Sequence, residues 1–84
     1  MKIRSNQYGN ANVIGKKVEF LRKQAKIKQK DFIAKLQLHG LDINPTSYSK
    51  LEGQVRNATD REVYVIAQVL GVDIIDIYND DYKF

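Results

Sequence analysis

The residues of this sequence with the clearest chemical potential are its lysines and arginines, whose positive charges could bind a polyanion. Residues 1–58 carry nine Lys and three Arg against four acidic residues, a net charge of +8. Residues 59–84 carry two basic and six acidic residues, a net charge of −4. A basic body with an acidic C-terminal segment suits a surface that binds a polyanion. A solvated, lysine-rich surface accounts for the same charges, so charge alone leaves both interpretations open.

Residue types that catalyse reactions or bind metals are scarce. The sequence has no Cys and a single His, which excludes disulfides and a Cys–His zinc site. His39 precedes Gly40, and we interpret it as a residue near a helix C-terminus, where a protonated imidazole favours the helix dipole. No Ser-His-Asp set and no phosphate-cradling glycine loop can be assembled. The sequence therefore predicts no enzyme activity, no cofactor, no metal and no evident small-molecule ligand.

Length and hydropathy restrict the class of protein further. A chain of 84 residues is expected to form one domain with a modest core, since so small a domain buries only about 60% of the surface that its unfolded chain exposes. The sequence contains no run of about 18 apolar residues and no basic-then-apolar signal at its N-terminus. With no Cys as well, we expect a cytoplasmic protein that does not interact with a membrane.

Two helices are predicted in the first half of the chain. Residues 1–11 lack periodicity and are expected to form an N-terminal arm. Asn12 is the expected N-cap of a helix that ends near Lys26. The spacing predicts an inner face made of Ile14, Val18, Leu21 and Ala25. A second, short helix begins at Lys28 or Gln29 and stops at His39–Gly40. Its apolar face holds Phe32, Ile33 and Leu36, with Leu38 as a further candidate.

The third helix has the clearest start signal. Asn44 is a preferred N-cap residue, and Pro45 follows at the first helical position, where the missing N–H has no cost. The helix is expected to end at Glu52, before Gly53, with Tyr48 and Leu51 pointing inward.

The last two helices follow a polar loop over residues 54–58. Thr59 and Glu62 form a capping box, and Gly71 is placed to end the fourth helix. Its predicted inner stripe is Val63, Ile66, Ala67 and Leu70. Asp73 is the expected cap of a short last helix containing Ile74, Ile77 and Tyr78, and residues 79–84 form a tail. The sequence thus predicts an all-α domain over residues 12–78, a compact globule of five crossing helices.

Three segments in this order resemble the phage-repressor and Cro-like helix-turn-helix proteins, also called the XRE family. The resemblance covers about residues 13–78. It rests on the segments IGKKVEFLRKQAKIKQKDFIAKL, SYSKLEG and VYVIAQVLGVDIIDIY. It implies a lambda-repressor-like fold in which helices two and three form the helix-turn-helix. It also implies binding of double-stranded operator DNA, commonly by dimers, with the third helix in the major groove.

The resemblance also implies which residues contact DNA. Pro45, Thr46 and Lys50 match positions that point at base edges. Lys50 has an independent argument, because an ammonium can donate to guanine O6 and N7, and the Thr46 methyl could contact a thymine methyl. The positions expected to contact the backbone are Lys28, Gln29, Asn44, Ser47, Gln54, Arg56 and Asn57.

Individual members of the backbone set have their own physical reasons. Gln29 matches a residue whose side chain and helix N-terminus lie against a phosphate. Arg56 is the predicted phosphate clamp of the polar loop, and Lys28 replaces the family's usual Ser or Thr cap with a charge. Without the family, Gln29 would be interpreted as an ordinary first-turn residue. Thr46 and Ser47 would be interpreted in the same way.

The resemblance further implies a structural ion pair. Arg22 and Glu52 match family positions that form a partly buried pair between the first helix and the end of the third. Two unrelated surface charges are the alternative. Tyr48 stands where the family has an aliphatic core residue, so we expect it to be packed with its hydroxyl at the rim.

The connection before the third helix departs from the family pattern. The segment QLHGLDI makes it longer than the tight turn of the shortest members. Leu41 and Ile43 have the character to pin this loop to the core. The tilt of the third helix, and hence the side chain that meets each base, stays open.

Sequence-specific binding of double-stranded DNA, with repression by operator occupancy, is the function that the sequence predicts. A second copy of the chain is a candidate partner, because two-fold dimers match two-fold operators. Apolar area for this contact is offered by Ile74, Ile77, Tyr78, Tyr82 and Phe84, which could equally close the core. The alternative is a helical protein-interaction module that keeps the fold without binding DNA.

Overall fold

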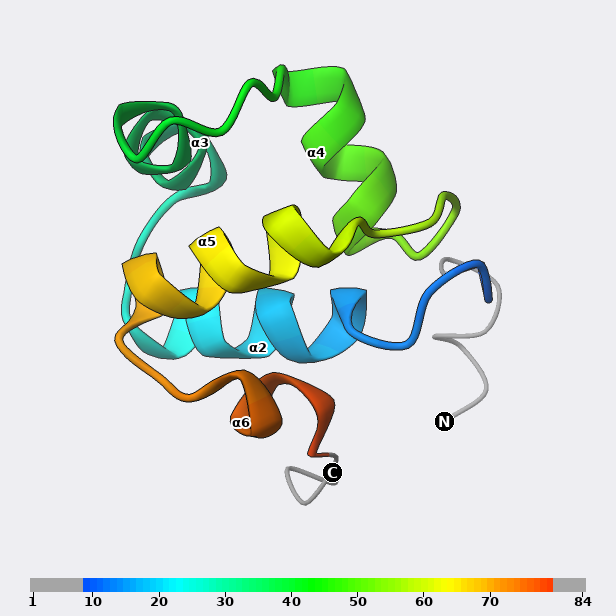
Figure 1. The fold of residues 1–84 in the computed structure, drawn as a ribbon. Coiled ribbons are helices and arrows are strands. Elements are labelled where there is room, and N and C mark those ends of the chain that lie inside the picture. Colours follow the sequence, from blue (N-terminus) through cyan, green and yellow to red (C-terminus); the bar gives the residue numbers. More distant parts are fainter. Residues whose placement is uncertain (1–8, 80–84) are drawn as a thin grey trace.

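The computed structural model describes residues 9–79, and most of them are helical (Figure 1). The helices are α2 (Gly15–Gln24), α3 (Gln29–Leu38), α4 (Pro45–Glu52), α5 (Asp60–Leu70) and α6 (Ile74–Tyr78). Residues 9–79 contain no strand, which confirms the expected all-helical architecture. None of the helices in this range is long and apolar enough to cross a membrane.

Helices α2 and α5 lie side by side at the centre of the molecule. Helix α6 packs on both of them from one side, whereas α3 and α4 lie on the other side (Figure 1). Helix α3 contacts α5, α4 contacts α2, and α3 and α4 contact each other. The pair α3 and α4 therefore forms one side of the molecule, and α6 forms the opposite side.

The core draws its side chains from all five helices and from the α3–α4 connection. Its buried apolar members are Ile14, Val18, Phe32, Ile33, Leu36, Leu41, Ile43, Tyr48, Leu51, Val63, Val65, Ile66, Ala67 and Ile77. Most of the predicted inward residues are in this cluster. Phe32 and Tyr48 meet edge to face, with ring centroids 5.7 Å apart, an arrangement that adds to the stabilisation from burial alone.

Two residues predicted to point inward, Ala25 and Leu38, are exposed, which corrects the expected inner faces of the first two helices. Ala25 follows the last residue of α2 and has left the inner face. Leu38 is the last residue of α3, and its side chain is 86% exposed because it lies on the side of the helix that carries Ala34 and Lys35, away from the buried face. In the five-residue α6, Ile77 alone is buried, and Ile74 and Tyr78 face solvent.

The predicted helix starts and stops are confirmed where the sequence signals were strongest. Asn44 accepts a hydrogen bond from the Ser47 N–H (2.7 Å), with Pro45 in the first turn of α4. Thr59 and Glu62 form the reciprocal capping box of α5. Gly71 ends α5 with a left-handed φ of 72°, which costs glycine nothing because it has no Cβ.

The long α3–α4 connection is held firmly. Gly40 takes a φ of 89°, and the next N–H, that of Leu41, donates back to the Leu36 carbonyl (3.1 Å). These are features of a Schellman helix end. The Gln37 amide donates to the Ile43 carbonyl (2.7 Å). Leu41 and Ile43 are buried, as predicted, so the extra residues do not loosen the position of α4.

Candidate nucleic-acid interface

Helix α4 has one buried face and one open face. Tyr48 and Leu51 are fully buried. Because side chains three and four residues apart share a helix face, the residues between them project away from the core. The exposed residues of α4 are Pro45, Thr46, Ser49 and Lys50. All three positions expected at base edges therefore lie on an accessible surface.

The beginning of α3 brings positive charge to the neighbouring surface. Lys28 and Lys30 are exposed, and α3 packs against α4. Asn44 is exposed at the start of α4, but its side-chain oxygen caps the helix. Ser47 is half-buried, and its carbonyl accepts a hydrogen bond from Arg56 (3.0 Å). The surface of α3 and α4 thus combines hydroxyl groups with ammonium groups.

The buried carboxylate of Glu52 joins three helices beneath this surface. Arg22 of α2 donates to it through Nε (2.9 Å to Oε2) and Nη2 (3.1 Å to Oε1). Gln29 of α3 donates to Oε1 (3.1 Å), and the Tyr48 hydroxyl of α4 donates to Oε2. Glu52 is 5% exposed and Arg22 is 6% exposed. Such a saturated carboxylate fixes the orientation of α4 relative to α2 and α3.

Burial and charge shift the pKa values of the partners of Glu52. Burial raises the pKa of the Tyr48 phenol far above its usual range, and the adjacent Glu52 carboxylate raises it further. Burial alone would lower the pKa of the Arg22 guanidinium, but hydrogen bonds and charge from Glu52 outweigh it, so the pKa is raised. Tyr48 therefore stays a donor, and Arg22 stays charged.

Gln29 lies between α3 and α4 instead of pointing freely outward. Its amide nitrogen donates to Glu52, and its amide oxygen accepts from the Ser49 hydroxyl (3.3 Å). Both ends of the side chain thus have partners within the protein. Its expected phosphate contact would have to use the backbone N–H or exchange one of these bonds.

Arg56, the expected phosphate clamp, has most of its donors occupied by its own chain. It forms a two-point ion pair with Glu62 (2.8 and 3.0 Å) and also donates to the carbonyls of Ser47 and Asn57. Four of its five N–H groups are therefore used. The sequence of the polar loop gives no local signal of this pairing, because Glu62 lies in α5.

The Arg56–Glu62 pair also shifts the pKa of the carboxyl. Burial alone would raise the pKa of Glu62, but the hydrogen bonds from Arg56 and Thr59 outweigh burial and lower it. The carboxylate is thus charged when it receives the guanidinium. This pair ties the loop after α4 to the start of α5.

Gln54 and Asn57, the other loop residues expected at the backbone, differ in accessibility. Gln54 adopts a φ of 61°, and its amide donates to the Asn12 carbonyl (2.8 Å), so its donor turns towards α2. Asn57 is exposed, although its carbonyl accepts from Arg56. Of the two side chains, that of Asn57 is the more accessible.

Asn12 and Gly15 support α4 from α2, and the sequence analysis missed this role. Asn12 was expected as the N-cap of the first helix, but the N-cap residue of α2 is Ile14; the Asn12 oxygen accepts from the N–H groups of Ile14 and Gly15. Its amide nitrogen also donates to the carbonyls of Leu51 (3.0 Å) and Arg56 (2.8 Å). A Cβ on Gly15 would lie 2.4 Å from the Leu51 carbonyl oxygen, so only glycine permits this approach.

The last residues of the expected N-terminal arm are also bonded to the end of α4. The N–H of Gly9 donates to the Gly53 carbonyl (2.8 Å), and that of Ala11 donates to the Gln54 carbonyl (2.8 Å). Residues 9–11 are exposed but are joined to the end of α4 by these two hydrogen bonds. Residues 1–8, like Tyr82 and Phe84 of the tail, lie outside the described residues.

No protein-family model, curated protein or solved structure matches the chain. Within residues 9–79, no group of three or more His, Asp or Glu side chains is arranged to hold a metal ion.

Proposed function

We propose that this protein binds double-stranded DNA sequence-specifically through α4 and regulates transcription by occupying an operator. In this proposal α3 and α4 act as a helix-turn-helix of the lambda-repressor-like type. The observation that carries the proposal is the open polar face of α4, with Thr46, Ser49 and Lys50 exposed, above a carboxylate that holds the helix rigidly from below. A major groove about 12 Å wide admits one helix.

The contacts in this proposal divide into two kinds. Lys50 and Thr46 read base edges, with Pro45 at the start of the helix contributing shape. Lys28, together with the exposed Lys30, neutralises phosphates, and Asn44, Ser47 and Asn57 lie close to the backbone. Gln54 and Arg56 hold the loop after α4 in place, so their contribution to DNA binding is less direct. Phosphate contacts set the position of the protein, whereas base contacts select the site.

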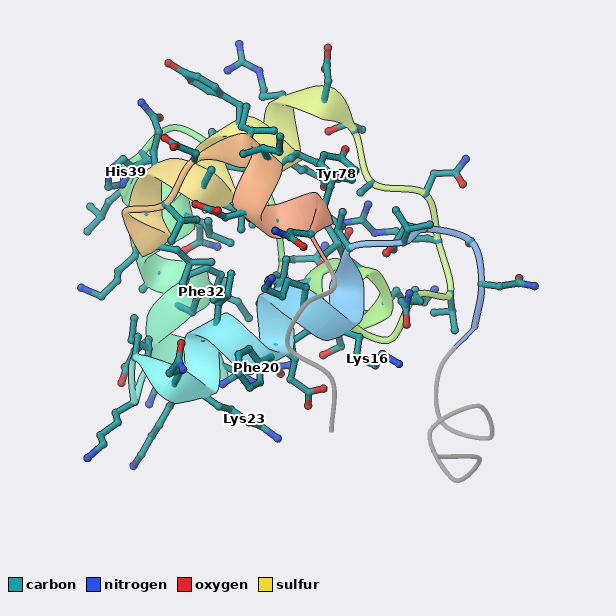
Figure 2. The ribbon with its side chains drawn as sticks, turned by 90° about the horizontal axis from the view of Figure 1, so that it is seen from below. Lys16, Phe20, Lys23, Phe32, His39 and Tyr78 are labelled. Carbon is teal, nitrogen blue, oxygen red and sulfur yellow. The ribbon has the colours of Figure 1, made fainter. Side chains whose placement is uncertain are left out.

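The experiment begins with selection of bound duplexes from a random oligonucleotide pool, followed by titration of the selected duplex and a scrambled one. Lys50→Ala is expected to weaken binding to the selected site by roughly 1–3 kcal/mol and to relax the base choice at one position. Binding to scrambled DNA should change much less. The charge-matched control is Lys23→Ala, because Lys23 points outward from α2 (Figure 2) and pairs with Glu19.

The outcomes separate this proposal from a protein-interaction module. If no duplex is enriched and binding to DNA is undetectable at low salt, the proposal is wrong. If Lys50→Ala lowers affinity for all duplexes equally and leaves the base preference intact, DNA binding stands but α4 does not read bases through Lys50.

A further inference from the structure

A shallow groove runs along α3, on a side of the helix that does not form the core. It is lined by α3 residues at helical spacing and by the turn that precedes them, namely Lys26, Ile27, Asp31, Ala34, Lys35 and Leu38. Leu38 is the most exposed large apolar residue of the described chain, at 86%. Lys26 and Lys35 are exposed beside it. We call this surface the α3 groove; its lining combines the apolar residues Ile27, Ala34 and Leu38 with two lysines and one acid.

Helix α6 presents the complementary chemistry. Ile77 anchors it in the core, so its other side chains face solvent. Ile75 is 72% exposed, and Tyr78 is 53% exposed. Asp73 and Asp76 are exposed on either side of Ile75 in the sequence. The exposed surface of α6 is thus an apolar ridge with acidic flanks.

We propose that the α3 groove of one copy of this chain receives α6 of a second copy, head to tail. Ile75 of one copy would pack against Leu38 of the other, while Asp73 and Asp76 would face Lys26 and Lys35. Apolar contact at the centre with opposite charges at the rim is the usual composition of a protein interface. The charges of the whole chain are complementary in the same way, because residues 59–84 are acidic and residues 1–58 are basic.

The α3 groove and the exposed surface of α6 cannot contact each other within one molecule. Helix α6 packs on α2 and α5, and Tyr78 of α6 lies well apart from His39, the residue after α3 (Figure 2). The contact therefore joins different surfaces of two copies, and each added copy leaves one groove and one ridge open. Such heterologous contacts build rings or rows of subunits, unlike a two-fold dimer. The contact does not depend on the proposed DNA binding, although a row would suit adjacent sites.

The test measures self-association of the full chain without DNA, by sedimentation at increasing concentration in low salt. Lys35→Glu, in the groove, and Ile75→Arg, on α6, should each weaken self-association by about tenfold or more, because each places like charges opposite one another. Neither position contributes a side chain to the core. Arg61→Glu and Val13→Arg are the matched controls, since both residues are exposed and lie outside the two surfaces. Circular dichroism verifies that every variant is folded.

The decisive sample is an equimolar mixture of Lys35→Glu and Ile75→Arg. A head-to-tail contact predicts that the mixture associates again, since one variant retains an intact α6 and the other retains an intact groove. A symmetric dimer through α6 predicts that Lys35→Glu associates like the unmodified chain and that the mixture shows no rescue of Ile75→Arg. That result, or a chain that stays monomeric at all concentrations in low salt, overturns the proposal.

Discussion

At the scale of single residues, Glu52 is the side chain on which the position of α4 depends most. Its two oxygens receive four hydrogen bonds, from Arg22, Gln29 and Tyr48. A buried charge pair of this kind adds little net stability compared with apolar packing. Removal of one partner is different, because it leaves the other charge buried without compensation.

We therefore expect Glu52→Ala to destabilise the protein by about 3 kcal/mol, since it leaves the Arg22 guanidinium buried and unpaired. In a domain of this size the melting temperature should fall by more than about 10 °C. Thermal unfolding followed by circular dichroism measures the shift. Lys23→Ala is the control: it breaks the Glu19–Lys23 pair, in which the lysine side chain is 66% exposed and the glutamate side chain is 18% exposed, and it should cost about 1 kcal/mol or less. An unchanged melting temperature for Glu52→Ala would show that the buried pair does not form.

The raised pKa of Tyr48 leads us to expect that the protein loses stability at alkaline pH. Because the pKa of Tyr48 is raised in the folded state, its contribution is fully present below the unfolded-state pKa of about 10 and is lost as pH rises above that value. Tyr48→Phe should cost about 1 kcal/mol at neutral pH through the lost hydrogen bond. Urea unfolding at pH 8 and pH 11 should show a smaller loss of stability in the variant than in the unmodified chain. Equal losses would contradict the buried, protonated phenol.

At the scale of elements, the junction between the start of α2 and the end of α4 decides how closely the two helices approach. The backbone of α2 passes so near the Leu51 and Glu52 carbonyls that a methyl group at Gly15 would lie 2.4 and 2.6 Å from their oxygens. Backbone atoms cannot move aside as a flexible side chain can. The glycine is therefore required by packing rather than by its own dihedral angles.

Gly15→Ala is expected to destabilise the fold by roughly 1–3 kcal/mol, as overpacking of a close contact does. This outcome is opposite to the usual gain from replacing glycine inside a helix. Gly53→Ala is the matched control, since the nearest contact of an added Cβ is 3.2 Å, to the Ser49 carbonyl oxygen, and a much smaller change is expected. Chemical denaturation measures both. A stabilised Gly15→Ala protein would mean that α2 and α4 lie farther apart.

At the scale of the whole molecule, charge is distributed unevenly. The basic residues 1–58 include Lys28, Lys30 and Lys50 on the side of α3 and α4, and α6, with its acids, packs on the opposite side. If DNA approaches α4, the acidic segment is kept at a distance from its phosphates. The same asymmetry favours one direction of approach, because a polyanion is attracted to one side and repelled from the other.

A measurement of salt dependence tests this arrangement. The logarithm of the DNA affinity should fall linearly with the logarithm of salt concentration, and Lys28→Ala should reduce the slope by about 0.9 per monomer, because one phosphate contact is lost. Selected and scrambled duplexes should be affected alike. Arg56→Ala is expected to change the slope less than Lys28→Ala, since its N–H groups are used internally. A larger effect from Arg56 would support its predicted role as the phosphate clamp.

The sequence by itself determined where α4 and α5 begin and where α5 ends. The signals at Asn44, Pro45, Thr59 and Gly71 act over a few residues, through capping bonds and allowed φ values, so neighbours along the chain suffice to specify them. The periodicity of apolar residues likewise predicted most of the core. The inward placement of Tyr48 and Leu51 in α4 followed from the same periodicity.

The tertiary structure alone decided which polar groups are occupied and which are available. Arg56 and Gln54 look like surface residues in the sequence, but their partners Glu62 and Asn12 come from other elements. Gly15 is required by a carbonyl 36 residues away along the chain. Contacts between residues distant in sequence have no local pattern, because they arise only when the helices pack.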